Sequence, residues 1–328
     1  MKPFRYDRAA DIAGAVATLA GEPDGMFLAG GTNLVDLMKL DVMTPDVLVD
    51  VRCLTSAEIE DLPDGGLRIG AAVTNSELAA DRKIRSSYPV LSQAVLAGAS
   101  GQLRNLATTG GNLLQRTRCV YFYDTTTPCN KREPGTGCSA LEGCNKDHAI
   151  FGASRQCVAT HPSDMAVAMT ALDAVVRVQG PSGARAIPIT ELYRLPNQEP
   201  ERDTTLDRAE LITAVDLPPP GFSSNSRYRK ARERASYAFA LVSVAAAVQV
   251  RDGVVRDARI ALGGVAHKPW RAVKAEEALR GWPAAEESFR AAAEAELEGA
   301  APLRDNAYKV PLAANLMTRT LLDLSGQR

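Results

Sequence analysis

Five of the chain's six cysteines fall in one polar segment of about fifty residues, between Gly110-Gly111-Asn112 and Pro162-Ser163-Asp164. They are Cys119, Cys129, Cys138, Cys144 and Cys157. The segment is rich in Gly, Thr, Asn, Lys and Arg, and it has too little apolar patterning to fold on its own. Clustered thiols can staple such a segment through disulfides, a structural zinc ion or an iron–sulfur cluster. Which of these three groups holds the segment therefore largely decides the function.

The cysteine spacing favours an iron–sulfur cluster. Residues 1–7 contain no apolar core of signal-peptide type, so we expect a chain made in the cytosol, where thiols stay reduced. Structural zinc sites usually pair ligands two to four residues apart, whereas the gaps here are nine, eight, five and twelve residues. Zinc nevertheless stays an alternative, because two histidines could complete a mixed site, namely His148 and His161.

Four thiolates are needed for a cubane cluster, and five are present. We take Cys119, Cys129 and Cys138 as the first three ligands. The shorter loop slightly favours Cys144 as the fourth, but loop closure changes by only ~0.6 kcal/mol per doubling of length. A ligand at Cys157 would pin the exit of the segment, as Cys119 pins its entrance, so we expect Cys157.

The charge of the segment gives mild support. It holds six basic residues against four acidic ones, namely Arg116, Arg118, Lys131, Arg132, Lys146 and Arg155 against Asp124, Glu133, Glu142 and Asp147. A net positive loop favours a cluster with four thiolate ligands, whose overall charge is negative.

Two glycine motifs could bind a dinucleotide. They are Ala29-Gly30-Gly31-Thr32-Asn33 and Thr108-Thr109-Gly110-Gly111-Asn112. Paired glycines let the backbone approach an anion closely, and Thr and Asn add hydrogen bonds. Each motif alone could be a mere tight turn, and neither matches the Gly-x-Gly-x-x-Gly fingerprint. Two such motifs in one domain, however, suit the two phosphates of a dinucleotide.

The elements that position these motifs can be predicted from periodicity and turn residues. We expect helices over 11–20, 34–40, 90–99, 164–174 and 284–298, strands over 26–29, 47–51, 67–73 and 175–178, and a hairpin of 241–250 with 254–262. Thr74-Asn75-Ser76-Glu77 is a capping box, Ser163 is a helix N-cap, and Pro218-Pro219-Pro220-Gly221 is a linker.

Composition excludes several classes of function. The chain has 328 residues, a net charge of -1 and a pI near 6.4, so two or three domains and no nucleic acid or membrane surface are expected. The longest apolar run, 237–250, is shorter than the ~20 residues that span a bilayer.

The motifs resemble a known family. Phe27-Leu28-Ala29-Gly30-Gly31-Thr32-Asn33-Leu34, Thr108-Thr109-Gly110-Gly111-Asn112 and Pro162-Ser163-Asp164 resemble the flavin-binding motifs of molybdenum hydroxylase medium subunits. This family includes the xanthine dehydrogenases, carbon monoxide dehydrogenases and aldehyde oxidoreductases. The resemblance covers the whole chain, because 229–232, 237–242 and 267–272 look like that family's C-terminal flavin domain.

The cysteine segment is similar to insertions in the flavin subunits of bacterial periplasmic aldehyde oxidoreductase and 4-hydroxybenzoyl-CoA reductase. The amino-acid sequence around Cys119, Cys129 and His161 is closer to that of the aldehyde oxidoreductase type. The resemblance implies FAD and one [4Fe-4S] cluster in this chain. It also implies a small partner subunit with two [2Fe-2S] clusters and a large subunit with the molybdenum cofactor. Asp164 belongs to the implied FAD site, and Lys230 is placed near the flavin, with a plain surface lysine as its alternative.

The implied fold is α+β, with an FAD-binding domain over 1–220, subdomains about 1–55 and 56–220, the cluster insertion about 115–160, and a C-terminal domain over 221–328. The expected function is electron transfer from iron–sulfur clusters through FAD to a soluble acceptor in a molybdenum-dependent aldehyde oxidoreductase. A free-standing flavoenzyme of the same fold and a zinc-stapled nucleotide-binding module are the alternatives. With no signal of its own the chain is expected in the cytoplasm, unless a partner with a twin-arginine signal carries it folded into the periplasm.

Overall fold

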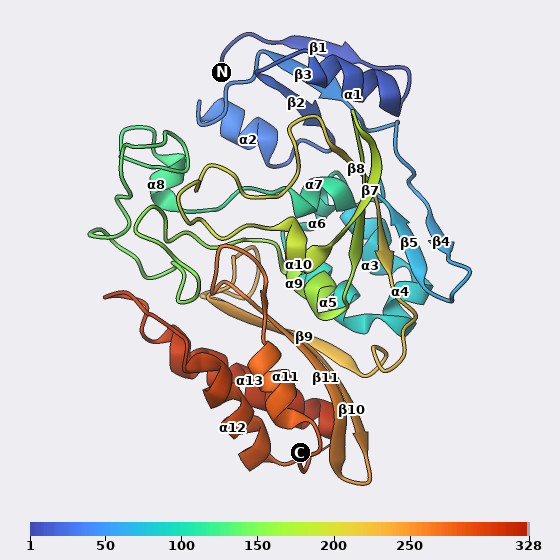
Figure 1. The fold of residues 1–328 in the computed structure, drawn as a ribbon, viewed down its shortest axis with the longest axis vertical. Coiled ribbons are helices and arrows are strands. Elements are labelled where there is room, and N and C mark those ends of the chain that lie inside the picture. Colours follow the sequence, from blue (N-terminus) through green and yellow to red (C-terminus); the bar gives the residue numbers. More distant parts are fainter. Residues whose placement is uncertain (327–328) are drawn as a thin grey trace.

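The computed structural model describes residues 1–326 and contains three separate sheets. The first, at the top of Figure 1, is parallel with the order β1-β3-β2. Its strands are β1 (Arg5–Arg8), β2 (Gly25–Leu28) and β3 (Val47–Asp50), joined by α1 (Ile12–Ala20) and α2 (Leu34–Lys39). The Asp11 side chain caps α1, and Ala15, Val16 and Leu19 of this helix pack on β3.

The second sheet forms the centre of the molecule and is antiparallel, with the order β4-β5-β8-β6-β7. Its strands are β4 (Ile59–Asp61), β5 (Leu67–Gly70), β6 (Val175–Gly180), β7 (Gly183–Pro188) and β8 (Leu211–Leu217). The helices that accompany it are α3 (Asn75–Ala80), α4 (Arg82–Ser87), α5 (Pro89–Ala97), α6 (Gly101–Arg104), α7 (Thr109–Leu113), α9 (Asp164–Ala171) and α10 (Ile189–Leu192). The predicted capping box at Thr74 and the N-cap at Ser163 are both present.

The third sheet has the order β12-β11-β10-β9 and lies at the bottom of Figure 1. It contains the predicted hairpin, as β10 (Val242–Arg251) and β11 (Val254–Gly263), with β9 (Ser226–Ala231) and β12 (Trp270–Arg271) at its edges. Its apolar residues form one core with α11 (Val273–Leu279), α12 (Glu286–Leu297) and α13 (Lys309–Ser325). The predicted α+β class with an antiparallel C-terminal sheet is thus confirmed.

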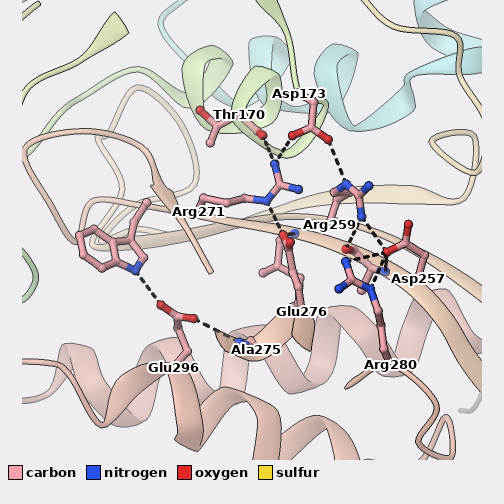
Figure 2. A network of polar contacts seen from close by, with 12 residues as sticks. Thr170, Asp173, Asp257, Arg259, Arg271, Ala275, Glu276, Arg280 and Glu296 are labelled. Atoms are coloured by element: carbon pink, nitrogen blue, oxygen red, sulfur yellow. Dashed lines mark hydrogen bonds and ion pairs between the residues drawn. The ribbon is translucent and has the colours of Figure 1, made fainter. Parts of the chain in front are cut away.

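A polar network joins the third sheet to α9 of the central part (Figure 2). Arg271 donates to Asp173 Oδ1 at 2.6 Å and to the Thr170 carbonyl at 2.7 Å, and Arg259 donates to Asp173 Oδ2 at 2.9 Å. The same Arg271 pairs with buried Glu276, whose Oε1 also accepts the Ile260 N–H at 2.7 Å.

The cysteine segment leaves the central part after α7 and returns at α9 (green in Figure 1). Its only helix is the short α8 (Val120–Tyr123). The segment contacts the first subdomain where Arg118 pairs with Asp36 at 3.2 Å. It contacts the C-terminal part where the buried Lys309 ammonium donates to the carbonyls of Asp147 (2.9 Å) and His148 (3.0 Å).

No helix within residues 1–326 is both long enough and apolar enough to cross a bilayer.

Candidate functional site: a flavin cavity beside a cysteine cavity

A cavity of about 990 Å³ lies where the two glycine motifs, the start of α9 and strand β9 meet. This volume is at the upper end for small-molecule sites and suits a ligand as large as a dinucleotide. All the predicted FAD residues except Thr109 line it, namely Phe27, Leu28, Ala29, Gly30, Gly31, Thr32, Asn33, Leu34, Thr108, Gly110, Gly111, Asn112, Asp164 and Lys230.

The first glycine motif is an open anion cradle. Four successive backbone N–H groups have no hydrogen-bond acceptor within residues 1–326, namely those of Gly30, Gly31, Thr32 and Asn33. A side chain at Gly30 is sterically impossible, because its Cβ would lie 2.0 Å from the Leu106 carbonyl oxygen. Gly31 has φ +71°, the left-handed region that favours glycine. Unpaired N–H groups beside glycines are what a phosphate group requires.

The second motif contributes differently. The N–H groups of Thr109 and Gly110 donate to the carbonyls of Val73 (2.9 Å) and Ala71 (3.0 Å), and the Gly111 N–H donates to the Thr108 hydroxyl at 3.2 Å. The Thr109 hydroxyl also donates to the Val73 carbonyl, at 3.1 Å, and Thr109 is fully buried. This explains its absence from the cavity lining. The motif therefore supplies a close backbone wall rather than a second set of free donors.

Asn112 connects this motif to the segment after the cysteines. The Ser163 hydroxyl donates to Asn112 Oδ1 at 2.6 Å and accepts from the Ala166 N–H at 3.0 Å as the α9 cap. On the other side, Asn33 Oδ1 accepts the Arg116 N–H at 2.8 Å, while its Nδ2 is buried without a protein partner among the described residues. The two asparagines thus hold the entrance and exit of the insertion against the cavity wall.

Asp164 and Lys230 come together in the cavity wall. The Lys230 ammonium donates to Asp164 Oδ2 at 2.7 Å, and their side chains are only 4 % and 8 % exposed. The Tyr228 hydroxyl donates to the other carboxylate oxygen, and burial, followed by the Asp164 charge, raises the pKa of this phenol. Lys230 is therefore a buried, paired residue and not a surface lysine. Strand β9 presents both Tyr228 and Lys230 on one face, as the two-residue period of a strand requires.

The four predicted cluster ligands, Cys119, Cys129, Cys138 and Cys157, surround one small cavity. Cys129 and Cys157 are buried, whereas the fifth thiol of the segment, Cys144, is exposed and does not line this cavity. The backbones of Cys129 and Cys138 form an isolated antiparallel β-bridge, and both thiols are free. A hydrogen bond between Cys138 and Cys157 lowers the pKa of Cys138 to about 6. Cys119 lines both this cavity and the flavin cavity.

The donor set fits an iron–sulfur cluster. Four thiols placed around a common space, in a polar shell, are what a cubane requires, since each iron takes one cysteine. The cavity itself measures about 10 Å³, room for one water, so a cluster would move the four thiols apart. Within residues 1–326 no three His, Cys, Asp or Glu side chains meet closely enough to hold a single ion.

An ionic group that no sequence pattern indicated lies between the two cavities, with Lys131 buried and Arg116 and Asp203 partly exposed. Asp203, from the loop between α10 and β8, pairs with both Arg116 and Lys131. Burial opposes ionisation of Asp203, but the charges of Arg116 and Lys131 hold its pKa well below the usual range. Both cations were counted in the net charge of the insertion, but their partner lies outside it. No local pattern around Asp203 indicates this contact.

Two histidines lie close to this ionic group. Burial lowers the pKa of His161 to about 4 and that of His267 to about 3. Neither ring nitrogen of His267 has a hydrogen-bond partner among the described residues.

The sheets, the glycine cradles and the dinucleotide-sized cavity define a flavin-binding subunit of the molybdenum hydroxylase type. The comparisons agree: residues 2–220 match the FAD binding domain in molybdopterin dehydrogenase, and residues 226–324 match the CO dehydrogenase flavoprotein C-terminal domain. The chain belongs to this family and is an FAD-binding protein.

Among its relatives, the aldehyde oxidoreductase FAD-binding subunit PaoB of Escherichia coli is 51 % identical over all of both chains. The glyceraldehyde dehydrogenase medium chain of Sulfolobus acidocaldarius is 26 % identical over 85 % of this chain and 81 % of its own. Quinoline 2-oxidoreductase from Pseudomonas putida 86 has a chain with 25 % identity and a TM-score of 0.74 over 99 % of this chain and 98 % of its own. Carbon monoxide dehydrogenase from Oligotropha carboxidovorans shows the same fold, with a TM-score of 0.77 over all of both chains.

Proposed function

We propose that this chain is the electron-transfer subunit of a molybdenum-dependent aldehyde oxidoreductase, with FAD in the large cavity and a [4Fe-4S] cluster on Cys119, Cys129, Cys138 and Cys157. The observation that carries the proposal is the shared wall: Cys119 lines the flavin cavity and the thiol-lined cavity at once. Two redox sites in direct contact suit single-electron passage between them.

The roles of the chain's own residues follow from their contacts. The free N–H groups from Gly30 to Asn33 would bind the pyrophosphate, and Gly111 would provide the close wall opposite. The Asp164–Lys230 pair would hold a fixed cation and anion at the flavin, with Asp164 also held by the Tyr228 hydroxyl and Lys230 by the Ala97 carbonyl. Bound FAD supplies the chemistry that accepts single electrons and releases a pair to a soluble acceptor.

The assembly is proposed from the family and the relatives. The partners would be a small subunit with two [2Fe-2S] clusters and a large subunit with the molybdenum cofactor. The choice of an aldehyde as substrate rests on the Escherichia coli relative, which is named as an aldehyde oxidoreductase subunit and matches over its full length. No triad or paired-carboxylate arrangement in the sequence gives the chain an oxidation site of its own, which favours a relay over a free-standing flavoenzyme.

Paired serine variants test the cluster assignment. We expect Cys157→Ser to lose iron, acid-labile sulfide and the visible absorption of a cluster, because it removes one of four ligands. Cys144→Ser, the matched control from the same segment, should keep all three. Circular dichroism reports on the fold in both variants, because Cys144 lines the flavin cavity and flavin content alone would not separate folding from binding. Loss in Cys144→Ser with retention in Cys157→Ser would reverse the assignment, and wild-type protein without iron would remove the cluster from the proposal.

A further inference from the structure

Asp203, Lys131 and Arg116 form a continuous ionic bridge between the two cavities. Lys131 lines the thiol cavity, and its ammonium donates to the Pro200 carbonyl at 2.5 Å and pairs with Asp203 Oδ1. Arg116 pairs with Asp203 Oδ2 and lines the flavin cavity, as Asp203 does. The Arg116 backbone N–H is in turn held by Asn33 of the first glycine motif.

The bridge is buried on the side of the cysteines. The Lys131 side chain is only 1 % exposed, although it lies in a polar loop between Asn130 and Arg132. A lysine is rarely buried to this degree unless its charge is paired. Removing two charges from water costs several kcal/mol each, so this arrangement does not by itself argue for stability.

The bridge carries a net positive charge. Two cations share one carboxylate, which leaves one positive charge in excess; Lys131 is buried, whereas Asp203 and Arg116 are partly exposed. Lys131 lines the same cavity as the four thiols and lies two residues after Cys129, so its charge is close to any group that these thiols hold. In surroundings of low dielectric constant, such a charge acts strongly on any neighbouring group that gains an electron.

We propose that the Asp203-centred bridge sets the reduction potential of the cysteine-bound cluster, with Lys131 as a positioning residue that stabilises its reduced form. This inference rests on the proposed function. When a cluster gains one electron from a reductant, its negative charge increases by one, and the neighbouring net positive charge favours that state. Net charge and hydrogen bonds around the sulfurs are recognised determinants of such potentials.

Two substitutions in the complete protein give opposite predictions. Lys131→Met removes a cation, so the cluster should become harder to reduce, by a shift of about tenfold in the reduction equilibrium, or 59 mV for one electron. Asp203→Asn removes the anion, so the cluster should become easier to reduce. Both potentials are read from redox titrations followed by electron paramagnetic resonance, independently of turnover.

Two further variants serve as controls. Lys131→Arg keeps the charge and should retain a potential close to that of the wild type. Lys146→Met removes a cation from the same insertion, but this lysine is 47 % exposed and pairs with Glu233, so the potential should not move.

The outcomes separate the possibilities. Shifts of opposite sign in Lys131→Met and Asp203→Asn support the inference. Shifts of the same sign, no shift beyond that of Lys146→Met, or loss of iron from both variants overturn it, because the bridge would then only brace the insertion. A wild-type protein that binds FAD but no iron overturns the proposed cluster itself, which is a distinct result.

Discussion

At the scale of single residues, the two glycine motifs have different tasks despite their similar sequences. The first leaves four successive N–H groups free, whereas the N–H groups of the second are used within the protein. Gly30 is required because its Cβ would overlap the Leu106 backbone, so it keeps the two motifs together. Gly111 differs: it lines the cavity, and an added Cβ would lie 3.0 Å from the Thr108 hydroxyl oxygen and only in ordinary contact, at 3.8 Å, with the Ala29 Cβ.

We expect Gly111→Val to give folded protein with little bound flavin. The new Cβ would lie 3.0 Å from the Thr108 hydroxyl, and the two methyl groups would occupy space at the cavity wall. The ratio of flavin to protein after purification, with circular dichroism for the fold, measures the effect. Gly101→Val is the control, because nothing lies within 4 Å of its added Cβ. Normal flavin content in Gly111→Val would remove this residue from the site.

Two buried histidines predict a loss of stability on mild acidification. Burial keeps His161 and His267 neutral in the folded state, with pKa values of about 4 and about 3, whereas the unfolded chain protonates them near 6.5. Above pH 6.5 neither contributes to the pH dependence of unfolding. Below it, the unfolded state binds more protons, so each histidine lowers the free energy of unfolding by up to about 1.4 kcal/mol per pH unit.

Chemical denaturation at pH 7.5, 6.5 and 5.5 measures this slope. His267→Gln should reduce it by about one proton, because both ring nitrogens lack protein partners and the amide does not titrate. The nearby charges, Lys131 and Asp203, are unchanged in the variant, so the difference between the two proteins isolates His267. Equal slopes in the wild type and the variant would contradict the assignment of a neutral His267.

At the scale of elements, strand β9 and helix α9 both contribute to the cavity wall, although their paired residues Lys230 and Asp164 are 66 residues apart in the sequence. The N-terminus of α9 provides Asp164 under the Ser163 cap, and β9 provides Lys230 and Tyr228. The network in Figure 2 joins the end of α9 to β11, β12 and α11 of the C-terminal part. Arg271 is its centre, with contacts to Asp173, Thr170 and Glu276.

Arg271→Met should therefore destabilise the protein by about 3 kcal/mol, because it leaves Glu276 buried without its cation. Burial already raises the pKa of Glu276, and Arg271 opposes this effect. The midpoint and slope of urea unfolding measure the change. Arg280→Met is the matched control: its guanidinium is 49 % exposed and 3.3 Å from Asp257, so less than about 1 kcal/mol is expected. Equal losses in both variants would show that burial at Arg271 is not decisive.

At the scale of the whole molecule, the cysteine insertion contacts both the first subdomain and the C-terminal part. Arg118 meets Asp36 of α2, and Lys309 at the start of α13 holds the carbonyls of Asp147 and His148. The insertion is thereby held at the flavin cavity by two regions that are distant in sequence. The predicted boundaries near 55 and 220 remain a prediction.

The isolated chain should not oxidise aldehydes. Its cavity holds the residues for binding a flavin, and the proposal assigns the oxidation step to a molybdenum-bearing partner. We expect an aldehyde-dependent rate at background in preparations whose molybdenum content is measured as nil. Flavin reduced by dithionite should still be reoxidised by soluble acceptors, which controls for a functional cofactor. Aldehyde turnover by the molybdenum-free chain would overturn the relay.

Two strands, β8 and β9, were not predicted from the sequence. β8 is the central strand of the five-stranded sheet, yet its Leu-Ile-Thr-Ala-Val-Asp-Leu run was not predicted as a strand, although the Pro218-Pro219-Pro220-Gly221 linker follows it directly. β9 was not predicted as a strand, because Arg227, Arg229 and Lys230 hide its alternation. Three of these residues are neutralised by partners far away in the chain, such as Asp323 and Asp164.

The sequence by itself determined the motifs that depend only on residues close together in the chain. Glycine pairs beside Thr and Asn, the capping box at Thr74, the Asp252-Gly253 turn and the spacing of the thiols depend on neighbours a few residues apart, so they can be recognised without a fold. The family resemblance then added the cofactors and partners that those motifs imply.

Only the tertiary structure decided which distant groups meet. It placed Cys144 outside the thiol cavity, paired Lys230 with Asp164, and left the N–H groups of only the first glycine motif free. It also brought Asp203 between Lys131 and Arg116, 72 residues from Lys131 along the chain. Such pairings arise from the packing of whole elements, because a buried charge must find its partner wherever the fold places one.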